Sequence, residues 1–265
     1  MKTDTALRHW ILGLLTPAAV LLALAGPAPA QLEPGEFDSG PFDAMLKTYV
    51  TEGWVDYAAW KANDLAALDA YLADAGQYDL TSTMGKEPRA AFLINVHNAW
   101  AVRQILEHYP VDSVTEIPGF FRENTTTVAG EELSLVGIED KLASMIPRQP
   151  TFAFALARGT VGGPRLHDHV ATGATLIKDL WEAASDFATK AHTVYYDAGP
   201  NELHVPPQLL AHVELYFAFE NGMGEVLADY INLDELVAIN YNKPTLVVDP
   251  QDMSLNDVSR RPAKP

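Results

Sequence analysis

The segment at residues 90–102 constrains the fold more than any other part of this sequence, because nearly every residue in it is apolar. Pro88 and Pro110 stand on either side of it. Since proline is tolerated in the first turn of a helix but cannot continue one, this spacing predicts a single helix between them. A helix that is apolar on all sides has no face for water, so we expect it to lie at the centre of the domain.

Three polar side chains interrupt this helix. At helical spacing Asn95 and Asn98 share one face, whereas His97 points nearly the opposite way, toward Gln104, which predicts two separate polar spots. A buried amide without a partner costs about 1–3 kcal/mol, so the asparagines are expected either to pin a loop to the core or to contact a ligand. His97 is expected to be a buried core residue with Gln104 as its candidate partner, and the alternative is a ligating histidine.

The first thirty residues have the pattern of a secretory signal peptide. Lys2 and Arg8 precede an apolar run at 10–25, and residues 28–30 form a cleavage site of small residues. A membrane anchor is the alternative, but the run is short and is interrupted by Pro17. We therefore expect a periplasmic or secreted protein with no membrane span after signal cleavage.

Composition excludes several classes of function. The formal net charge is −17, and the predicted cleavage removes Lys2, Arg8 and Asp4, which makes the mature chain slightly more acidic. An acidic surface repels phosphate backbones, so we expect no nucleic-acid partner. The charge otherwise keeps the protein soluble or attracts cations. The chain has no cysteine, which rules out thiol nucleophiles, thiolate metal sites and disulfide bonds.

The pattern of apolar residues predicts an α+β fold. Helical spacing, strand alternation and turn residues predict these elements: helices at 42–50, 63–72, 134–146, 172–191, 206–219 and 223–231, hairpins at 125–133 and 194–205, and strands at 151–156 and 246–248. Asn63, Ser134 and Thr172 are the expected N-caps of three helices. We expect a helical domain around the buried central helix, with a small, mainly antiparallel sheet.

The same patterns divide the chain into segments. Residues 31–40 are polar and contain proline and glycine, and the chain carries no internal repeat. We therefore predict a signal peptide at 1–30, a flexible leader at 31–41, a single domain at 42–257 and a disordered tail at 258–265.

Several short segments resemble, in their order and spacing, the bacterial family known as domain of unknown function 547. They lie at residues 53–57, 92–99, 108–113, 133–139, 152–164 and 252–256. The resemblance extends from about Met45 to Asp257, nearly the whole chain after the signal peptide. It implies one domain of this family, whose name establishes no activity.

Some positions depart from the family pattern, and they are the ones that matter for chemistry: Arg158 and Gly163 replace cysteines, Asp140 replaces a histidine, His97 replaces a tyrosine and Met253 replaces a tryptophan. The retained positions are Asn95, Asn98, Glu139 and Pro164, with a hydroxyl kept at Thr160 in place of serine. The joint loss of the cysteines and the histidine indicates that this chain cannot use a thiol–histidine pair.

Thr160 and Glu139 are the catalytic candidates. Thr160 lies in a glycine-bounded loop whose backbone N–H groups could hold an oxyanion, and Glu139 could act as the base. The alternative for Thr160 is a turn whose glycines supply positive φ. The alternative for Glu139 is an ordinary exposed helix carboxylate. Asn95, Asn98 and Arg158 are the ligand-binding candidates, because Arg158 could pair with Glu139 or with a substrate carboxylate. Convergence of these groups on one cleft would support a site.

His167 and His169 are the candidate metal ligands. Two imidazoles two residues apart project the same way from an extended backbone, and with a carboxylate they could hold a divalent metal. A zinc site needs a third and a fourth ligand, and no other histidine has a diagnostic spacing. The alternative is a solvated polar loop at the start of a helix.

The sequence leaves two functions open. The first is an exported, non-catalytic binding or scaffolding domain, which the joint loss of cysteine and histidine favours. The second is a hydrolase or transferase that uses Thr160, or a metal-bound water at His167 and His169. The small-molecule or protein ligand, the substrate and the oligomeric state are not determined by the sequence.

Overall fold

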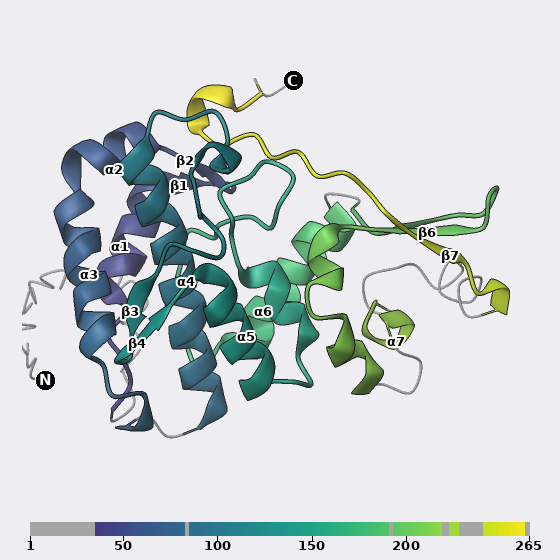
Figure 1. The fold of residues 1–265 in the computed structure, drawn as a ribbon, viewed down its shortest axis with the longest axis horizontal. Coiled ribbons are helices and arrows are strands. Elements are labelled where there is room, and N and C mark those ends of the chain that lie inside the picture. The colour runs from purple at the N-terminus through teal and green to yellow at the C-terminus, as the bar shows by residue number, and fades with distance from the viewer. Residues whose placement is uncertain (1–34, 83–84, 191–192, 219–222, 228–240, 263–265) are drawn as a thin grey trace, which may run out of the picture. The chain divides into compact units, whose positions relative to one another are not determined.

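The computed structural model describes residues 35–82, 85–190, 193–218, 223–227 and 241–262. Its helices and strands, in chain order, are α1 (Gly40–Tyr49), β1 (Val50–Thr51), β2 (Trp54–Val55), α2 (Tyr57–Asn63), α3 (Leu65–Gln77), α4 (Lys86–His108), β3 (Thr126–Val128), β4 (Glu131–Leu133), α5 (Leu135–Met145), α6 (Leu176–Ala184), β5 (Tyr195–Asp197), β6 (Glu202–Val205), α7 (Met223–Leu227) and β7 (Thr245–Val248) (Figure 1). The predicted signal peptide and residues 228–231 of the last predicted helix lie outside the described residues.

The fold is α+β, as the sequence predicts. The strands form separate small sheets: β1 pairs with β2 and β3 with β4, both antiparallel, while β6 pairs antiparallel with β5 and parallel with β7. The predicted mainly antiparallel sheet is therefore divided into small pieces in the described residues. Among these residues, no helix combines the length and the hydrophobicity needed to cross a bilayer.

Helix α4 is the central element, and its prediction is confirmed. Residues 90–99 are all buried, and α2, α3, α5 and α6 pack against the helix (Figure 1). Pro88 lies in its first turn, and the helix ends at His108, ahead of Pro110. The other elements thus bury their apolar faces against one desolvated helix, as the absence of a polar face requires.

Both ends of the described domain extend beyond the predicted boundaries. Phe37 lies in the predicted flexible leader, yet its ring packs 5.0 Å from Phe92 and 5.5 Å from Tyr71 between centroids. In the predicted disordered tail, Val258–Arg260 forms a 3-10 helix, and Arg260 pairs with Asp112. These residues are structured, in contrast to the prediction. Their aromatic and charged side chains contact residues that are distant in sequence, and local composition does not reveal such contacts.

The predicted strand at 151–156 is wrong. Residues Pro150–Ala155 form a 3-10 helix instead, with proline at its start, where the fixed φ of proline favours a helical turn. Every residue from 150 to 157 is buried. A half-buried strand is recognised by alternating buried and exposed positions. Here the large and the small side chains are all buried, so their alternation does not indicate a strand.

Several predicted helix starts and ends also differ. Ser134 caps α5 as predicted, since its hydroxyl accepts from Gly137 N at 3.1 Å. Asn63 instead ends α2, so it does not cap α3. Thr172 bonds to Thr175, its hydroxyl 2.8 Å away, in a turn that delays the start of α6 to Leu176. The predicted helix at 206–219 is replaced by two 3-10 helices, Pro207–Leu210 and Val213–Ala218.

The chain returns near its end to the region before α4. The backbone of residues 252–256 bonds to three distant segments through Val55 N to Asn256 O, Leu255 N to Asp112 O, Val161 N to Ser254 O and Gly162 N to Asp252 O, at 2.8 to 2.9 Å. The buried hydroxyl of Tyr57 donates to Asn256 Oδ1 at 2.7 Å. This late segment therefore joins β2, the loop after α4 and the loop after Arg158.

Candidate functional site

Asn95 and Asn98 each clamp a loop backbone with both polar atoms of the amide. Asn98 Nδ2 donates to Ala155 O at 3.0 Å, and Asn98 Oδ1 accepts from Ala157 N at 2.9 Å. Asn95 makes the equivalent pair with the carbonyl and the N–H of Ala171, at 2.8 and 2.9 Å. These contacts support the loop-pinning alternative directly. A ligand at either amide stays a prediction.

His97 belongs to the same network and not to a separate polar spot. Its Nδ1 lies 3.2 Å from Asn98 Oδ1, and its Nε2 lies 3.2 Å from Glu139 Oε1 on α5. The prediction of Gln104 as its partner is wrong, because Gln104 Oε1 instead accepts from Asn124 Nδ2 at 2.9 Å. Neighbouring helical positions diverge by only about 100°, so the imidazole reaches the next amide.

Glu139 is the centre of this network. Arg158 Nη2 donates to both of its carboxylate oxygens at 2.8 Å, and His212 Nε2 lies 3.9 Å from Oε2. The residue is only 2% exposed, so the alternative of an ordinary exposed helix carboxylate is wrong. The Arg158 guanidinium in turn lies 5.6 Å from the centroid of the Phe121 ring. We call Asn98, His97, Glu139 and Arg158 the buried network.

The electrostatics of Glu139 do not suit a general base. Burial raises the pKa of this carboxyl, but the hydrogen bond from His97 and the charge of Arg158 outweigh burial and hold the pKa below its usual range. A general base works best when its pKa lies near the working pH. The arrangement instead stabilises an ionised, internally paired carboxylate.

Thr160 has its own structural partners. The residue is 3% exposed, its Oγ1 accepts from Gln251 Nε2 at 2.9 Å, and its backbone pairs with Leu255. Gly159 beside it has φ +70°, and a Cβ there would lie 2.4 Å from Ile105 Cδ1, which matches the glycine-turn alternative. Among the described residues, no hydrogen bond or ion pair links Thr160 to Glu139 or to a histidine.

The predicted site residues therefore divide into separate groups. Arg158 and Glu139 are paired, Thr160 is bound to Gln251, and Asn95 is bound to Ala171. In the part of the chain that is described, hydrogen bonds connect Asn98 through His97 to Glu139 and Arg158, but no hydrogen bond joins Thr160 or Asn95 to that network. A cleft shared by all of them stays a prediction.

The matched family segment covers these residues. Residues 81–188 match the family model described as "Protein of unknown function, DUF547". Over this segment the chain is similar to the DUF547 family. No curated protein and no solved structure matches it. The DUF547 match is shorter than the 45–257 stretch of the sequence resemblance, so the resemblance outside it stays a prediction.

Within the DUF547 segment, His167 and His169 lie beside helix α6. Their ring centroids are 5.4 Å apart, and His169 Nδ1 lies 3.0 Å from Asp168 Oδ1. Burial and the nearby His169 lower the pKa of His167. One ligand atom each of His169, Asp179 and Glu182 lies within 4.8 Å of the others. The sequence prediction missed both carboxylates, although their spacing of three residues on a helix places them on one face.

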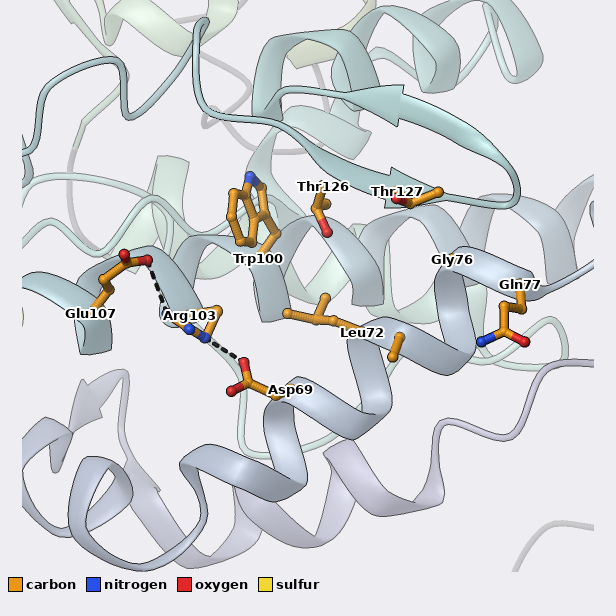
Figure 2. Close-up of a pocket in the computed structure, with 10 residues that line it drawn as sticks. Asp69, Leu72, Gly76, Gln77, Trp100, Arg103, Glu107, Thr126 and Thr127 are labelled. Atoms are coloured by element: carbon orange, nitrogen blue, oxygen red, sulfur yellow. Dashed lines mark hydrogen bonds and ion pairs between the residues drawn. The ribbon is translucent and has the colours of Figure 1, made fainter.

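A pocket that the sequence prediction missed lies between α3, α4 and β3 (Figure 2). We call it the α3–α4 groove. Its volume is about 430 Å³, and its lining is Asp69, Leu72, Ala73, Gly76, Gln77, Trp100, Arg103, Glu107, Thr126 and Thr127. Figure 2 shows the Arg103 side chain between Asp69 and Glu107, with which it is paired, and the indole of Trp100 further along α4. The helical spacing of Trp100, Arg103 and Glu107 was the available sequence signal.

Proposed function

We propose that this protein is an exported, non-catalytic binding domain that takes an uncharged saccharide in the α3–α4 groove. The groove is the observation that carries the proposal. Its volume lies within the range of about 300–1,000 Å³ that is usual for small-molecule pockets. Two helices and a strand form its walls, so the polar groups are held on rigid elements.

The lining chemistry favours a ligand with a flat apolar face and several hydroxyl groups. Trp100 supplies an indole, which provides a large apolar surface of fixed geometry. Gln77 and Thr126 supply neutral donors and acceptors in the same lining, and the Thr127 hydroxyl, which donates to Glu132, can still accept. Such a combination matches a saccharide ring, which has carbon–hydrogen faces and hydroxyl edges.

The charges of the groove disfavour an ionic ligand. Arg103 is already paired with Asp69 and with Glu107, whose Oε2 lies 3.1 Å from Arg103 Nη1. An anion would have to displace these carboxylates, and a cation would have to compete with the guanidinium. The planar guanidinium and the carboxylates remain able to bind hydroxyl groups at their free edges.

The non-catalytic part of the proposal rests on the buried network and on Thr160. Glu139 is occupied by Arg158 and His97, and the Thr160 hydroxyl is buried against Gln251. Neither group is presented to the groove. The export part rests on the signal-peptide pattern of residues 1–30 and predicts a mature protein that begins at Gln31, which intact mass and N-terminal sequencing check.

Calorimetric titration with disaccharides of glucose and of N-acetylglucosamine tests the binding. Trp100→Ala is expected to weaken binding by at least about tenfold. Gln77→Ala is expected to weaken it by a smaller factor. Gln77 is exposed, so its variant should fold normally. Trp181→Ala is the matched control, because Trp181 is 51% exposed on α6 and does not line the groove. The proposal would be contradicted if no disaccharide binds, or if both groove variants bind as tightly as the unmodified protein.

A metal-dependent hydrolase or transferase is the second candidate. It is favoured by the proximity of His169, Asp179 and Glu182, since three protein ligands leave a position for a reactive water. It requires turnover that a chelator and His169→Ala both abolish. Release of reducing ends from the same disaccharides, measured with added Zn²⁺, distinguishes this candidate from simple binding.

A further inference from the structure

The loop before α6 brings a histidine to two carboxylates of that helix. Asp179 and Glu182 are three residues apart on α6 and share one face. One ligand atom of each lies within 4.8 Å of a ring nitrogen of His169 and of the other carboxylate. All three side chains are partly buried, so they are neither inaccessible nor fully solvated.

We propose that His169, Asp179 and Glu182 bind a divalent transition metal of the Zn²⁺ class. An imidazole nitrogen combined with two carboxylate oxygens suits Zn²⁺, Co²⁺ or Mn²⁺. Mg²⁺ and Ca²⁺ prefer ligand sets made of oxygen alone. The donor set therefore selects the class of metal as well as the place.

The groups around the three ligands orient them as metal ligands are usually oriented. Asp168 Oδ1 lies 3.0 Å from His169 Nδ1, which leaves Nε2 as the ring nitrogen for a metal. Thr175 Oγ1 donates to Asp179 Oδ2 at 2.6 Å and leaves the other oxygen of that carboxylate without this contact. A carboxylate behind a ligating histidine fixes its tautomer and increases its basicity.

The backbone that carries His169 is fixed by two contacts to other helices. Val170 N donates to Asp43 Oδ1 on α1 at 3.1 Å, and Ala171 is clamped by Asn95 of α4. The position of His169 relative to α6 is thus set by the fold before any metal binds. A preformed set of ligands costs less ordering entropy when it binds an ion.

The structure also provides access to the site. A pocket of about 290 Å³ is lined by His167, Trp181, Glu182, Ser185 and Asp186, so it opens onto the Glu182 carboxylate. The centroid of the His167 ring lies 5.4 Å from that of His169, but His167 is not among the residues whose ligand atoms lie within 4.8 Å of one another. The Lys178–Glu182 ion pair at 2.9 Å is exposed, and a metal can displace it.

Metal titration of the purified, chelator-stripped protein tests the site without any activity assay. We expect one Zn²⁺ per chain by calorimetry and by metal analysis, a rise in melting temperature with Zn²⁺, and no comparable effect of Mg²⁺. Co²⁺ should give the visible absorption of a low-coordinate nitrogen–oxygen site. His169→Ala and the double variant Asp179→Asn/Glu182→Gln should each weaken Zn²⁺ binding by at least about tenfold.

His204→Ala is the matched control. His204 also lies between two carboxylates, with Nδ1 2.8 Å from Asp249 and Nε2 3.4 Å from Glu202, but those contacts use both ring nitrogens and leave none for a metal. This variant should bind Zn²⁺ as the unmodified protein does. The proposal would be overturned if His204→Ala loses as much Zn²⁺ binding as His169→Ala, or if binding survives in both His169→Ala and the double variant. Either result would mean that Zn²⁺ binds only adventitiously to the surface. Because the site is independent of the α3–α4 groove, Trp100→Ala should keep its zinc.

Discussion

At the residue scale, the chemistry of the buried network depends on one carboxylate. Glu139 is almost fully buried and is paired with Arg158 through both oxygens and with His97 through one. Arg158 lies at a position where the sequence resemblance implies a cysteine, and in this chain it places a cation beside Glu139. The network is stable only while each charge keeps its partner.

Replacement of Arg158 by alanine should therefore be costly. It leaves the Glu139 carboxylate buried without its bidentate partner, and removing one member of a buried pair typically costs about 3–5 kcal/mol. Urea unfolding followed by circular dichroism measures the change. The double variant Arg158→Met/Glu139→Leu should recover a large part of the loss, since no buried charge remains unpaired. A loss below about 1 kcal/mol in Arg158→Ala would mean that the pair is not desolvated.

The pairing of Glu139 also makes stability depend on pH. Because the pKa of this carboxyl is lowered in the folded protein, its contribution is fully present above its ordinary value of 4.5 and is lost as pH falls through the lowered pKa. Glu139→Gln removes that contribution. The difference in unfolding free energy between the two proteins should be constant near neutral pH and shrink in acid. A difference that grows on acidification would contradict the lowered pKa.

At the element scale, α4 positions two loops through its asparagines. Asn98 holds the end of the Pro150–Ala155 helix just before Arg158, and Asn95 holds Ala171 just after the histidine pair. A side chain of the central helix thus helps to hold each loop, together with the contacts to residues 252–256 and to Asp43. The polar residues of an otherwise apolar helix thus set the places of Arg158 and His169.

Asn98→Ala should release only the first of these loops. It leaves the carbonyl of Ala155 and the N–H of Ala157 without partners, and each such buried group costs about 1–3 kcal/mol. Hydrogen exchange should accelerate at the Ala157 amide and remain unchanged at Ala171. Asn95→Ala should give the reverse pattern. Acceleration at both amides in either variant would show that the two clamps are not independent.

The sequence predicts several local elements correctly but does not predict which side chains contact one another in the folded domain. The apolar run of α4, the Ser134 cap and the hairpins β3–β4 and β5–β6 follow from nearby residues, so the sequence predicted them. The partner of His97, the burial of Glu139 and the carboxylates beside His169 depend on how α5 and α6 pack against other elements. Residues 150–155 were misassigned because complete burial removes the polar face from which a period is read.

At the whole-molecule scale, residues 252–256 connect parts of the chain that are far apart in sequence. The side chain of Asn256 makes two such contacts: Oδ1 accepts from the Tyr57 hydroxyl at 2.7 Å, and Nδ2 donates to the Gly53 carbonyl at 2.8 Å. The loop after Arg158 bonds to the same segment through Gly159 and Val161. Such long-range contacts form only when the whole domain has folded, so they couple its two ends.

Asn256→Ala should therefore lower the stability of the whole domain. It leaves the buried Tyr57 hydroxyl and the Gly53 carbonyl unpaired, for an expected loss of about 2 kcal/mol or more. Asn63→Ala is the control, because that exposed side chain bonds to Ala59 O within α2 and lies beside the Tyr49 hydroxyl without contacting the late segment, and its effect should stay within about 0.5 kcal/mol. Thermal and urea unfolding should agree. Equal effects of the two changes would mean that the late segment carries no special stability.

The most direct test of the proposed function is the location of the ligand. Amide chemical shifts of the isotope-labelled protein, recorded during titration with the disaccharides of glucose and of N-acetylglucosamine, report which residues the sugar approaches. We predict shifts concentrated at Gln77, Trp100, Arg103 and Thr126, around the α3–α4 groove, with Arg158 and Thr160 unaffected. Shifts centred on Arg158 and Thr160, or no shifts at saturating sugar, would contradict a non-catalytic domain that binds its ligand in the groove.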